Sequence, residues 1–250
     1  MQPDFSSTVS DYARYRRPFP PALFERLRAV GIGSQNQRML DLGAGTGLLG
    51  SAFQVTGCEV WAVDSSLALL AASPNAELTR VVAKAEAIPF PRDFFDTVIA
   101  GQCWHWFDRH QAPLEIFRVL KPGGFVAAVY QMYAPLIGSV AEATEKLILR
   151  YQPRWRHANS AGINGQVLRD LQSNGFVDIE SFSFDVNHRF SHEEWRGFIR
   201  TTSAVGASLT PDRLKSFDLD HAALLNPWPE SLEIPHRIFA AIARKPGSRL

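Results

Sequence analysis

The sequence predicts an α/β fold built on a mostly parallel sheet, and three observations support this expectation. Short apolar runs alternate with longer amphipathic stretches between Arg38 and Val129, which is the pattern of repeated β-α-β units. An apolar strand within this block runs directly into a turn with three glycines. The chain has 250 residues, of which 46% are hydrophobic and 20% are charged, enough for one large core. We therefore expect residues 1–250 to form a single domain.

The block between Arg38 and Val129 contains five expected strands. Each is a short apolar run of the length typical of strands, and they occupy Arg38–Leu42, Glu59–Val63, Thr79–Ala83, Phe95–Ala100 and Gly124–Tyr130. Amphipathic stretches between them predict helices at Leu48–Thr56, Ser66–Ala72 and Gln111–Val119. The last of these helices is expected to end before residues 121–124, because a proline and two glycines there force a turn.

The chain outside this block is less regular. An N-terminal helix is expected at Pro21–Val30, since it starts with proline and Gly31 follows it. After Tyr130 the periodicity predicts helices at Val140–Tyr151, Val167–Ser173, His192–Thr202 and Pro211–Leu219, and strands at Phe176–Val186 and Ser231–Arg244.

Composition and charge exclude several classes of function. A formal net charge of +1 gives no general attraction to a phosphate backbone, so no nucleic-acid partner is expected. No apolar run approaches the ~20 residues that cross a bilayer. The first ten residues lack the basic and apolar regions of a secretory signal, so we expect no membrane partner and a cytoplasmic location. The two cysteines, Cys58 and Cys103, have no metal-ligand spacing, and no metal site is predicted.

The strongest signal is the segment Met39-Leu40-Asp41-Leu42-Gly43-Ala44-Gly45-Thr46-Gly47. Glycines at alternate positions after a strand are needed where a ligand approaches the turning backbone closely, or where the backbone takes a positive φ. The helix that follows begins with free N–H groups, which favour an electronegative or polar ligand group. We therefore expect this turn to bind a ligand.

Two kinds of nucleotide-like ligand remain open for this turn. The run from Gly45 to Gly50 also fits the dinucleotide pattern GxGxxG. Asp41, however, places an acid inside the strand just before the glycines. A carboxylate at that position would repel a pyrophosphate, whereas it suits a ligand that carries an ammonium group.

The same segment resembles motif I of the class I S-adenosylmethionine-dependent methyltransferases, and further motifs follow in order. The acid Asp64 ends the second expected strand. Three more segments resemble family motifs after the third strand, in the fourth strand and before the fifth: Lys84-Ala85-Glu86-Ala87-Ile88-Pro89-Phe90, Phe94-Phe95-Asp96-Thr97-Val98-Ile99 and Arg118-Val119-Leu120-Lys121-Pro122-Gly123-Gly124. The likeness spans roughly Leu40 to Val129 and points to the type 11, ubiquinone/menaquinone-biosynthesis-like group.

The resemblance implies a Rossmann-like three-layer α/β/α sandwich with a small helical cap. Its seven-stranded sheet would have the order 3-2-1-4-5-7-6, with strand 7 antiparallel. Residues 133–225 would partly supply the cap and the acceptor-binding insertions, and residues 1–20 would form an N-terminal lid segment.

The resemblance also implies a set of cofactor-binding residues. Asp41 would lie near the methionine part of S-adenosylmethionine, and Asp64 would accept hydrogen bonds from the ribose hydroxyls. Ala85 and Glu86 would flank the adenine, and Gly101 would begin the loop beneath the sulfonium. The other implied site residues lie in the glycine turn, directly after Asp64 and in the N-terminal segment: Gly43, Ala44, Gly45, Gly47, Ser65, Tyr15 and Arg16.

Two local segments are similar to a branch of the family that includes trans-aconitate-methyltransferase-like members. Residues 102–108 resemble that branch's H-W-F-D segment, and residues 12–20 resemble its Y-R-P-x-Y-P entry, with Arg17 and Phe19 as departures from it. His105 follows the fourth strand and is a candidate general base, because an imidazole titrates near neutral pH. The alternative is that His105 only packs beside its two tryptophan neighbours.

Together these features predict S-adenosylmethionine-dependent methyl transfer by in-line displacement to a small-molecule acceptor, with O- or carboxyl-methylation favoured. Two alternatives stay open. One is a nicotinamide-dependent oxidoreductase, and the other is a non-catalytic ligand-binding protein with a methyltransferase fold. We expect a monomer or a homodimer.

Overall fold

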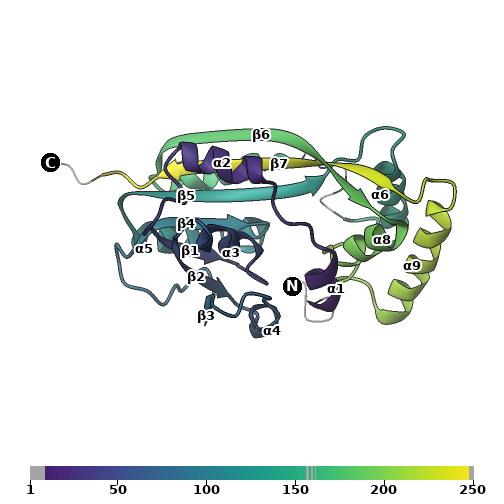
Figure 1. Cartoon of the computed structure of the whole chain (residues 1–250), viewed down its shortest axis with the longest axis horizontal. Coiled ribbons are helices and arrows are strands. Elements are labelled where there is room, and N and C mark those ends of the chain that lie inside the picture. Colours follow the sequence, from purple (N-terminus) through teal and green to yellow (C-terminus); the bar gives the residue numbers. More distant parts are fainter. Residues whose placement is uncertain (1–8, 156–157, 159, 161, 248–250) are drawn as a thin grey trace. The chain divides into compact units, whose positions relative to one another are not determined.

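The strands form one seven-stranded sheet in the order β3-β2-β1-β4-β5-β7-β6, as the computed structural model in Figure 1 shows. The structure describes residues 9–155, 158, 160 and 162–247. The strand order is the one that the family resemblance implied, so the predicted Rossmann-like sheet is confirmed.

The first five strands of the chain pair in parallel. β1 lies between β2 and β4, with Asp41 opposite Ala62 on one side and Ile99 on the other. Because parallel neighbours end at the same edge, the turns after β1, β2 and β4 gather there. The strand bounds are β1 Arg38–Leu42, β2 Glu59–Asp64, β3 Thr79–Val82, β4 Phe95–Gly101, β5 Leu120–Tyr133, β6 Val177–Phe190 and β7 Leu232–Arg244.

β7 runs antiparallel to β5. The Gly123 N–H donates to the carbonyl of Lys245, and the Lys245 N–H donates to the carbonyl of Gly124, both at 2.9 Å. Further along β5, the Ala134 N–H donates to the carbonyl of Pro235 at 2.8 Å. Partner numbers therefore fall along β7 as they rise along β5, which confirms the predicted antiparallel strand.

The helices follow the expected positions closely, with one addition. α1 is a short N-terminal helix that the sequence pattern did not predict. The bounds are α1 Val9–Tyr15, α2 Pro21–Ala29, α3 Leu48–Gln54, α4 Leu67–Ala71, α5 Gln111–Val119, α6 Val140–Tyr151, α7 Gly165–Ser173, α8 His192–Arg200 and α9 Pro211–Leu225, with a 3-10 turn η2 at Trp104–Trp106.

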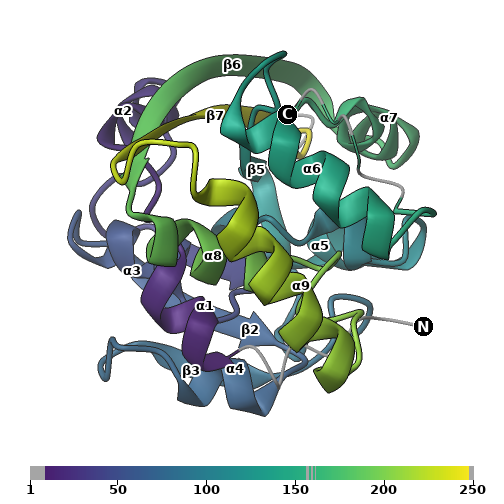
Figure 2. The same ribbon diagram turned by 90° about the vertical axis from the view of Figure 1, so that its right-hand side faces the viewer.

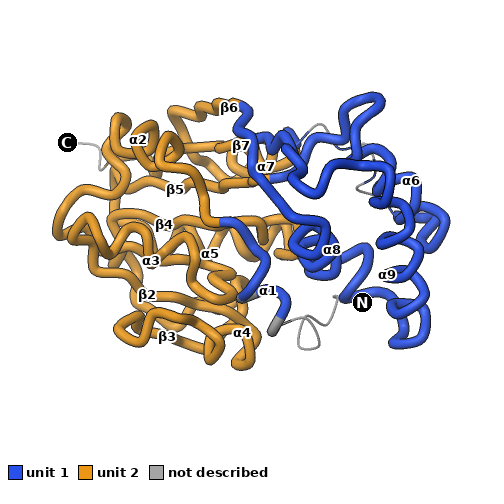
Figure 3. The backbone as a smooth tube through the Cα atoms, turned by 45° about the vertical axis from the view of Figure 1, so that its right-hand side comes forward, with its two compact units in different colours: residues 1–17, 132–163, 185–237 blue, residues 18–131, 164–184, 238–250 orange. Residues whose placement is uncertain are grey.

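The chain divides into two compact units built from interleaved segments (Figure 3). Unit 1 comprises Met1–Arg17, Met132–Ile163 and Asp185–Arg237, whereas unit 2 comprises Pro18–Gln131, Asn164–Phe184 and Ile238–Leu250. Unit 2 contains β1 to β4 and the glycine turn. The expected single domain, cap and lid stay predictions, and the first eight residues of the lid lie outside the described residues.

Unit 1 has an aromatic core of its own. Within it α8 packs against α1 and α9, and α6 packs against α9 (Figure 2). The rings of Trp195 and Phe198 on α8 stack with centroids 5.5 Å apart. Phe190 and Tyr133 meet Trp195 edge-on, at 5.4 and 5.3 Å. This cluster excludes water from the buried face of α8, which carries Trp195 and Phe198.

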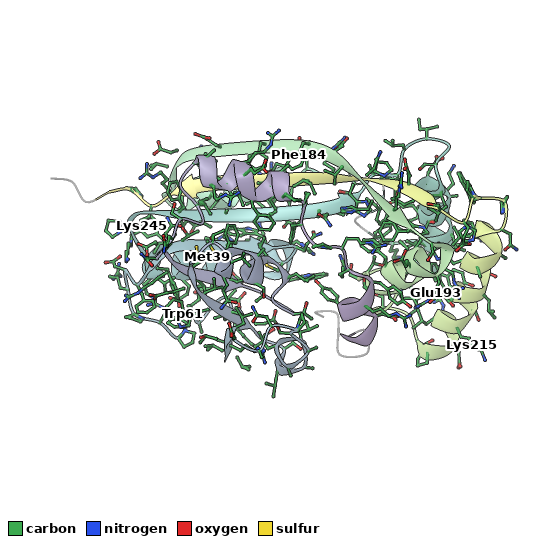
Figure 4. The ribbon with its side chains drawn as sticks, viewed as in Figure 1. Met39, Trp61, Phe184, Glu193, Lys215 and Lys245 are labelled. Atoms are coloured by element: carbon green, nitrogen blue, oxygen red, sulfur yellow. The ribbon has the colours of Figure 1, made fainter. Side chains whose placement is uncertain are left out.

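α1 is fixed to α8 by one close packing contact and by polar bonds. Tyr15 is buried, and its ring lies where a side chain on Gly197 would stand. The Tyr15 hydroxyl donates to Glu193, which is labelled on α8 in Figure 4, at 3.1 Å. Arg200 pairs with Asp11 of α1 at 2.8 Å. A seven-residue helix is too short to be stable alone, which explains why local sequence patterns did not reveal it.

Three elements, β5, β6 and α9, differ from their predicted bounds by more than two residues at an end. β5 begins at Leu120, because Leu120 pairs with Phe95 and a register shift then accommodates the proline and glycines that were expected to form a turn. β6 continues to Phe190 since its alternation continues. α9 continues to Leu225, because Phe217, His221 and Leu225 repeat at helical spacing and are buried.

Among the described residues, no helix has the length and apolar character required to cross a membrane. In the same part of the chain, His, Cys, Asp and Glu side chains form no group of three or more that could hold a metal ion.

Gly197→Ala is expected to destabilise the protein by about 1–3 kcal/mol, because the new methyl group overlaps the Tyr15 ring and forces α1 away from α8. Urea unfolding measures the change. Gly165→Ala is the matched control, since a Cβ at that helix start meets only Arg169, at 3.9 Å. Equal stability of the two variants would contradict the docking of α1 described above.

Candidate cofactor site

The turn after β1 is shaped by three glycines with positive φ. Gly43, Gly45 and Gly47 have φ values of 68°, 56° and 77°, a region that most residues avoid. A Cβ on Gly43 would stand 2.7 Å from the Cys103 sulfur, and one on Gly47 would stand 2.5 Å from Leu78. A Cβ on Gly45 would meet no atom within 4 Å, although Gly45 itself is buried. The turn therefore leaves a space over Gly45 that a ligand atom can occupy.

Asp41 lies in β1, just before this turn, and is only 1% exposed. Its Oδ2 accepts a hydrogen bond from the Gly50 N–H at 2.8 Å, whereas its Oδ1 is buried without a hydrogen-bond partner among the described residues. Burial raises the pKa of Asp41 to about 7, the Gly50 bond opposes this rise, and the nearby Asp64 carboxylate adds to it. Buried polar atoms without partners are uncommon, so this acid favours a ligand that brings a donor or a positive charge.

Gly50 is required by the position of Asp41. A Cβ at this position would stand 2.7 Å from Asp41 Oδ2 and 3.0 Å from Val60, so a larger residue would push the helix start away from the acid. Gly50, the last glycine of the GxGxxG pattern, is therefore needed so that its N–H can reach the Asp41 carboxylate. This role favours the ammonium-bearing ligand over the dinucleotide that the pattern alone left open.

Asp64 ends β2 at the same edge of the sheet. Its Oδ2 accepts from the Gly45 N–H and its Oδ1 accepts from the Ser66 N–H, both at 2.8 Å. Each oxygen keeps a further lone pair, which suits a pair of ribose hydroxyls. Ala44 donates to a carbonyl of β2 at 3.0 Å, which holds the turn beside Asp64. Ser65 is exposed.

The loop after β3 supports the loop after β4. Ala85 is buried, and Glu86 Oε1 accepts from the Asp108 N–H at 2.8 Å. The Asp108 side chain in turn accepts from the backbone N–H groups of His110 and Gln111 at the start of α5, at 2.9 Å each. Glu86, which was expected beside the adenine, therefore also joins the two loops that border the site.

The chain turns sharply where β4 ends. A Cβ on Gly101 would stand 3.0 Å from Leu49 and 3.6 Å from Phe19, so the position has little room. The next residue, Gln102, has a φ of 62°, which is unusual for a residue with a side chain. Backbone strain of this kind is concentrated at functional sites. The turn redirects the chain before η2, which contains His105.

His105 is exposed on η2, immediately after this turn. Its ring lies 4.4 Å from Trp106 and 5.9 Å from Tyr130, measured between ring centroids. The Tyr130 hydroxyl accepts from Asn164 at 2.8 Å. His105 thus belongs to an aromatic group in the same unit as the glycine turn.

Asp170 of α7 anchors η2 from a distant part of the sequence. It is 4% exposed and accepts from the Trp104 indole N–H at 3.1 Å. The Arg109 guanidinium donates to its other oxygen at 3.0 and 3.1 Å, and Gln166 donates to the same oxygen at 2.8 Å. Sequence reasoning missed Asp170, because nothing in the local pattern of α7 distinguishes a buried acid from a solvated one.

Tyr15 and Arg16 belong to unit 1, and their contacts lie within it. Tyr15 bonds Glu193, and the Arg16 guanidinium donates to the carbonyl of Thr201 at 3.1 Å. The remaining predicted cofactor residues lie in unit 2, where Asp41, Asp64 and the glycine turn come together. A cofactor-covering role for Tyr15 and Arg16 stays a prediction.

A glycine turn between two acids, on a sheet of this order, defines a Rossmann-like protein of the class I methyltransferase topology. The family model described as the methyltransferase domain, type 11, matches residues 40–128. Residues 40–128 therefore match a methyltransferase domain. This confirms the family that the motifs predicted, whereas the branch suggested by residues 102–108 stays a prediction.

Relatives and solved structures agree with this assignment. A protein of Mycobacterium tuberculosis (strain ATCC 25618 / H37Rv), named as an uncharacterized methyltransferase, is 36% identical over 149 residues, or 58% of this chain and 59% of that protein. The chain thus spans about three fifths of that relative's length. A second uncharacterized methyltransferase, from Schizosaccharomyces pombe (strain 972 / ATCC 24843), is 29% identical over 74% of this chain and 76% of that protein.

One solved structure is similar over nearly its whole length. It is a protein from Anaeromyxobacter dehalogenans, provisionally described as a type II methyltransferase. It superimposes with a TM-score of 0.70 and 25% sequence identity, and covers 93% of this chain and 99% of that chain.

The stability of the protein is expected to fall as the pH rises from about 4 to about 7, in part because of Asp41. Burial raises the pKa of Asp41 from 3.8 to about 7 in the folded state. Between these two values the unfolded chain releases the proton while the folded chain keeps it, so the contribution to stability is full below about 4 and is lost by about 7. Asp41→Asn removes the titration and should flatten the slope of unfolding free energy against pH. Parallel slopes for the two proteins in urea unfolding would contradict the raised pKa.

Proposed function

We propose that the protein transfers a methyl group from S-adenosylmethionine to a small-molecule acceptor. The observation that carries this proposal is the buried, partnerless Oδ1 of Asp41 beside the space over Gly45. A cationic ligand with an ammonium group would supply both the missing donor and the compensating charge. The residues present therefore fit this cofactor.

The two acids also argue against a dinucleotide. A pyrophosphate at this turn would lie close to Asp41 and Asp64, and like charges repel strongly where water is excluded. The N–H of Gly50, moreover, is already bonded to Asp41. These contacts favour the methyltransferase over the nicotinamide-dependent oxidoreductase that the glycine pattern allowed.

The cofactor contacts are proposed as follows. Asp64 binds the ribose hydroxyls through the second lone pairs of its oxygens. Ala85 and Glu86 border the adenine, and Gly101 leaves room beneath the sulfonium. Gly43, Ala44, Gly45, Gly47 and Ser65 form the surrounding backbone, and Tyr15 and Arg16 are proposed to cover the cofactor.

When bound, S-adenosylmethionine supplies an activated methyl group bonded to a sulfonium. The chain's contribution is to align that group with the acceptor and to exclude water from both. His105 is the proposed general base, which takes the proton of a hydroxyl or carboxyl acceptor. O- or carboxyl-methylation of a small molecule is the proposed reaction, in a cytoplasmic monomer or homodimer.

Asp64→Ala is expected to weaken the binding of S-adenosylhomocysteine by more than ~1 kcal/mol, because the ribose loses two hydrogen-bond acceptors. Titration calorimetry measures the affinity of the variant and of the parent protein. Glu77→Ala, at an exposed turn of the same unit, is the control and should bind normally.

The same calorimetry tests the alternatives. Tight binding of NAD without binding of S-adenosylhomocysteine would contradict the proposed cofactor. Binding of the cofactor without any release of label from methyl-labelled S-adenosylmethionine, over a panel of small carboxylic acids and alcohols, would favour the non-catalytic binding protein.

His105→Gln is expected to lower the rate of label transfer by a factor of about 100 or more, because general-base catalysis contributes ~10²–10⁴-fold. Cofactor affinity should not change. His110→Gln removes an exposed imidazole from the same loop and serves as the matched control. If both variants retain the parent rate, His105 is a packing residue and not a base.

A further inference from the structure

Unit 1 contains two histidines on adjacent strands that serve no role in the site described above. His188 on β6 and His236 on β7 meet with their ring centroids 4.8 Å apart. Phe190 stacks on His236 at 5.7 Å, and Phe198 meets it edge-on at 5.6 Å. The two imidazoles are thus held rigidly between aromatic rings.

The Nε2 atom of His236 carries a lone pair that can accept a hydrogen bond. Its Nδ1 lies 2.9 Å from the carbonyl oxygen of Ile234. Because a carbonyl only accepts, Nδ1 carries the proton and Nε2 is the unprotonated nitrogen of a neutral ring. Burial lowers the pKa of His236 to about 3, which keeps the ring neutral. The residue is fully buried, and within the described part of the chain its Nε2 has no hydrogen-bond partner.

Arg16 brings to the same place a positive charge that pairs with no carboxylate among the described residues. Its guanidinium lies 5.2 Å from the ring centroid of Phe198, the ring that also meets His236. Its one hydrogen bond among the described residues goes to the neutral Thr201 carbonyl, and its Nε is buried without a partner. By contrast, Arg17, Arg196 and Arg200 each pair with a carboxylate in the described part of the chain.

The buried nitrogens of Arg16, His188 and His236 therefore lack partners in one small region. Arg16 is half-buried with its Nε shielded from solvent, and a cation partly removed from water without a counterion is unfavourable. A buried lone pair without a donor is unfavourable too. Both are satisfied by one kind of ligand, which carries a negative charge for Arg16 and a hydroxyl for His236. Two neighbouring groups with these properties define a hydroxycarboxylate.

We propose that Arg16, His188 and His236 form a binding site for a hydroxycarboxylate, with the carboxylate on Arg16 and the hydroxyl donating to His236 Nε2. A carboxylate fits better than a phosphate, because Arg17 is already neutralised by Glu194 at 3.0 Å and only one positive charge remains. The binding of the acid is independent of the proposed function. Its role as the methyl acceptor rests on that function.

Titration calorimetry with lactate and propionate tests the site, in the presence of saturating S-adenosylhomocysteine. The two acids differ only in the hydroxyl. Lactate is expected to bind about threefold tighter or more, which is the effect of one hydrogen bond. Arg16→Gln should weaken lactate binding about tenfold or more, since a charge-assisted bond is lost. Arg14→Gln, at an exposed position two residues earlier in the chain, is the matched control.

His236→Phe keeps an aromatic ring on Phe190 and removes the lone pair, so it should abolish the preference for lactate over propionate. Equal binding of the two acids to the parent protein would overturn the proposal. Tighter binding of inorganic phosphate than of lactate would also overturn it.

The same titrations separate this proposal from the proposed function. If lactate does not bind while S-adenosylhomocysteine does, only the acid site fails. If Arg16→Gln weakens S-adenosylhomocysteine and leaves lactate unchanged, Arg16 covers the cofactor and the acid site is again overturned.

Discussion

The burial of the Asp41 carboxylate is the constraint on which the rest of the cofactor site depends. An acid inside a central parallel strand is unfavourable unless its oxygens are bonded, and the described residues supply a bond to only one of them. Gly50 must be glycine to reach that oxygen, and the sharp turn that brings α3 back to β1 requires positive φ at three further glycines. Asp64 then holds the turn from β2. The glycines of the turn and Asp64 thus all serve to accommodate the buried carboxylate of Asp41.

The central part of the fold was predictable because its signals are local. The strand at Arg38–Leu42 and the helix at Gln111–Val119 have the predicted bounds, since each is an uninterrupted apolar or amphipathic run flanked by glycine or proline. The motif residues Asp41, Asp64 and Gly45 could also be found from sequence, because their spacing follows from the β-α-β geometry.

The rest depends on contacts between distant segments, which no single stretch of sequence reveals. Asp170 and Trp104 are 66 positions apart and still form the bond that anchors η2. α1 packs against α8 through the Tyr15 ring, which lies where a side chain at Gly197 would stand. Arg16 was expected to cover the cofactor from its likeness to a family segment. Its lack of a carboxylate partner among the described residues becomes visible only when the partners of the neighbouring arginines are known.

Each unit contains a shielded polar group for which the described residues supply no oppositely charged partner. In unit 2 it is the negative Asp41, and in unit 1 it is the positive Arg16. A protein that folds without a ligand would be more stable with these residues replaced by apolar ones, so their presence is better explained by binding than by stability. The signs also match the proposed chemistry, because the methyl donor carries an ammonium and a sulfonium, whereas an acid acceptor carries a carboxylate. A catalyst for this pair needs opposite charges in two places, since a single pocket of one sign would attract one partner and repel the other.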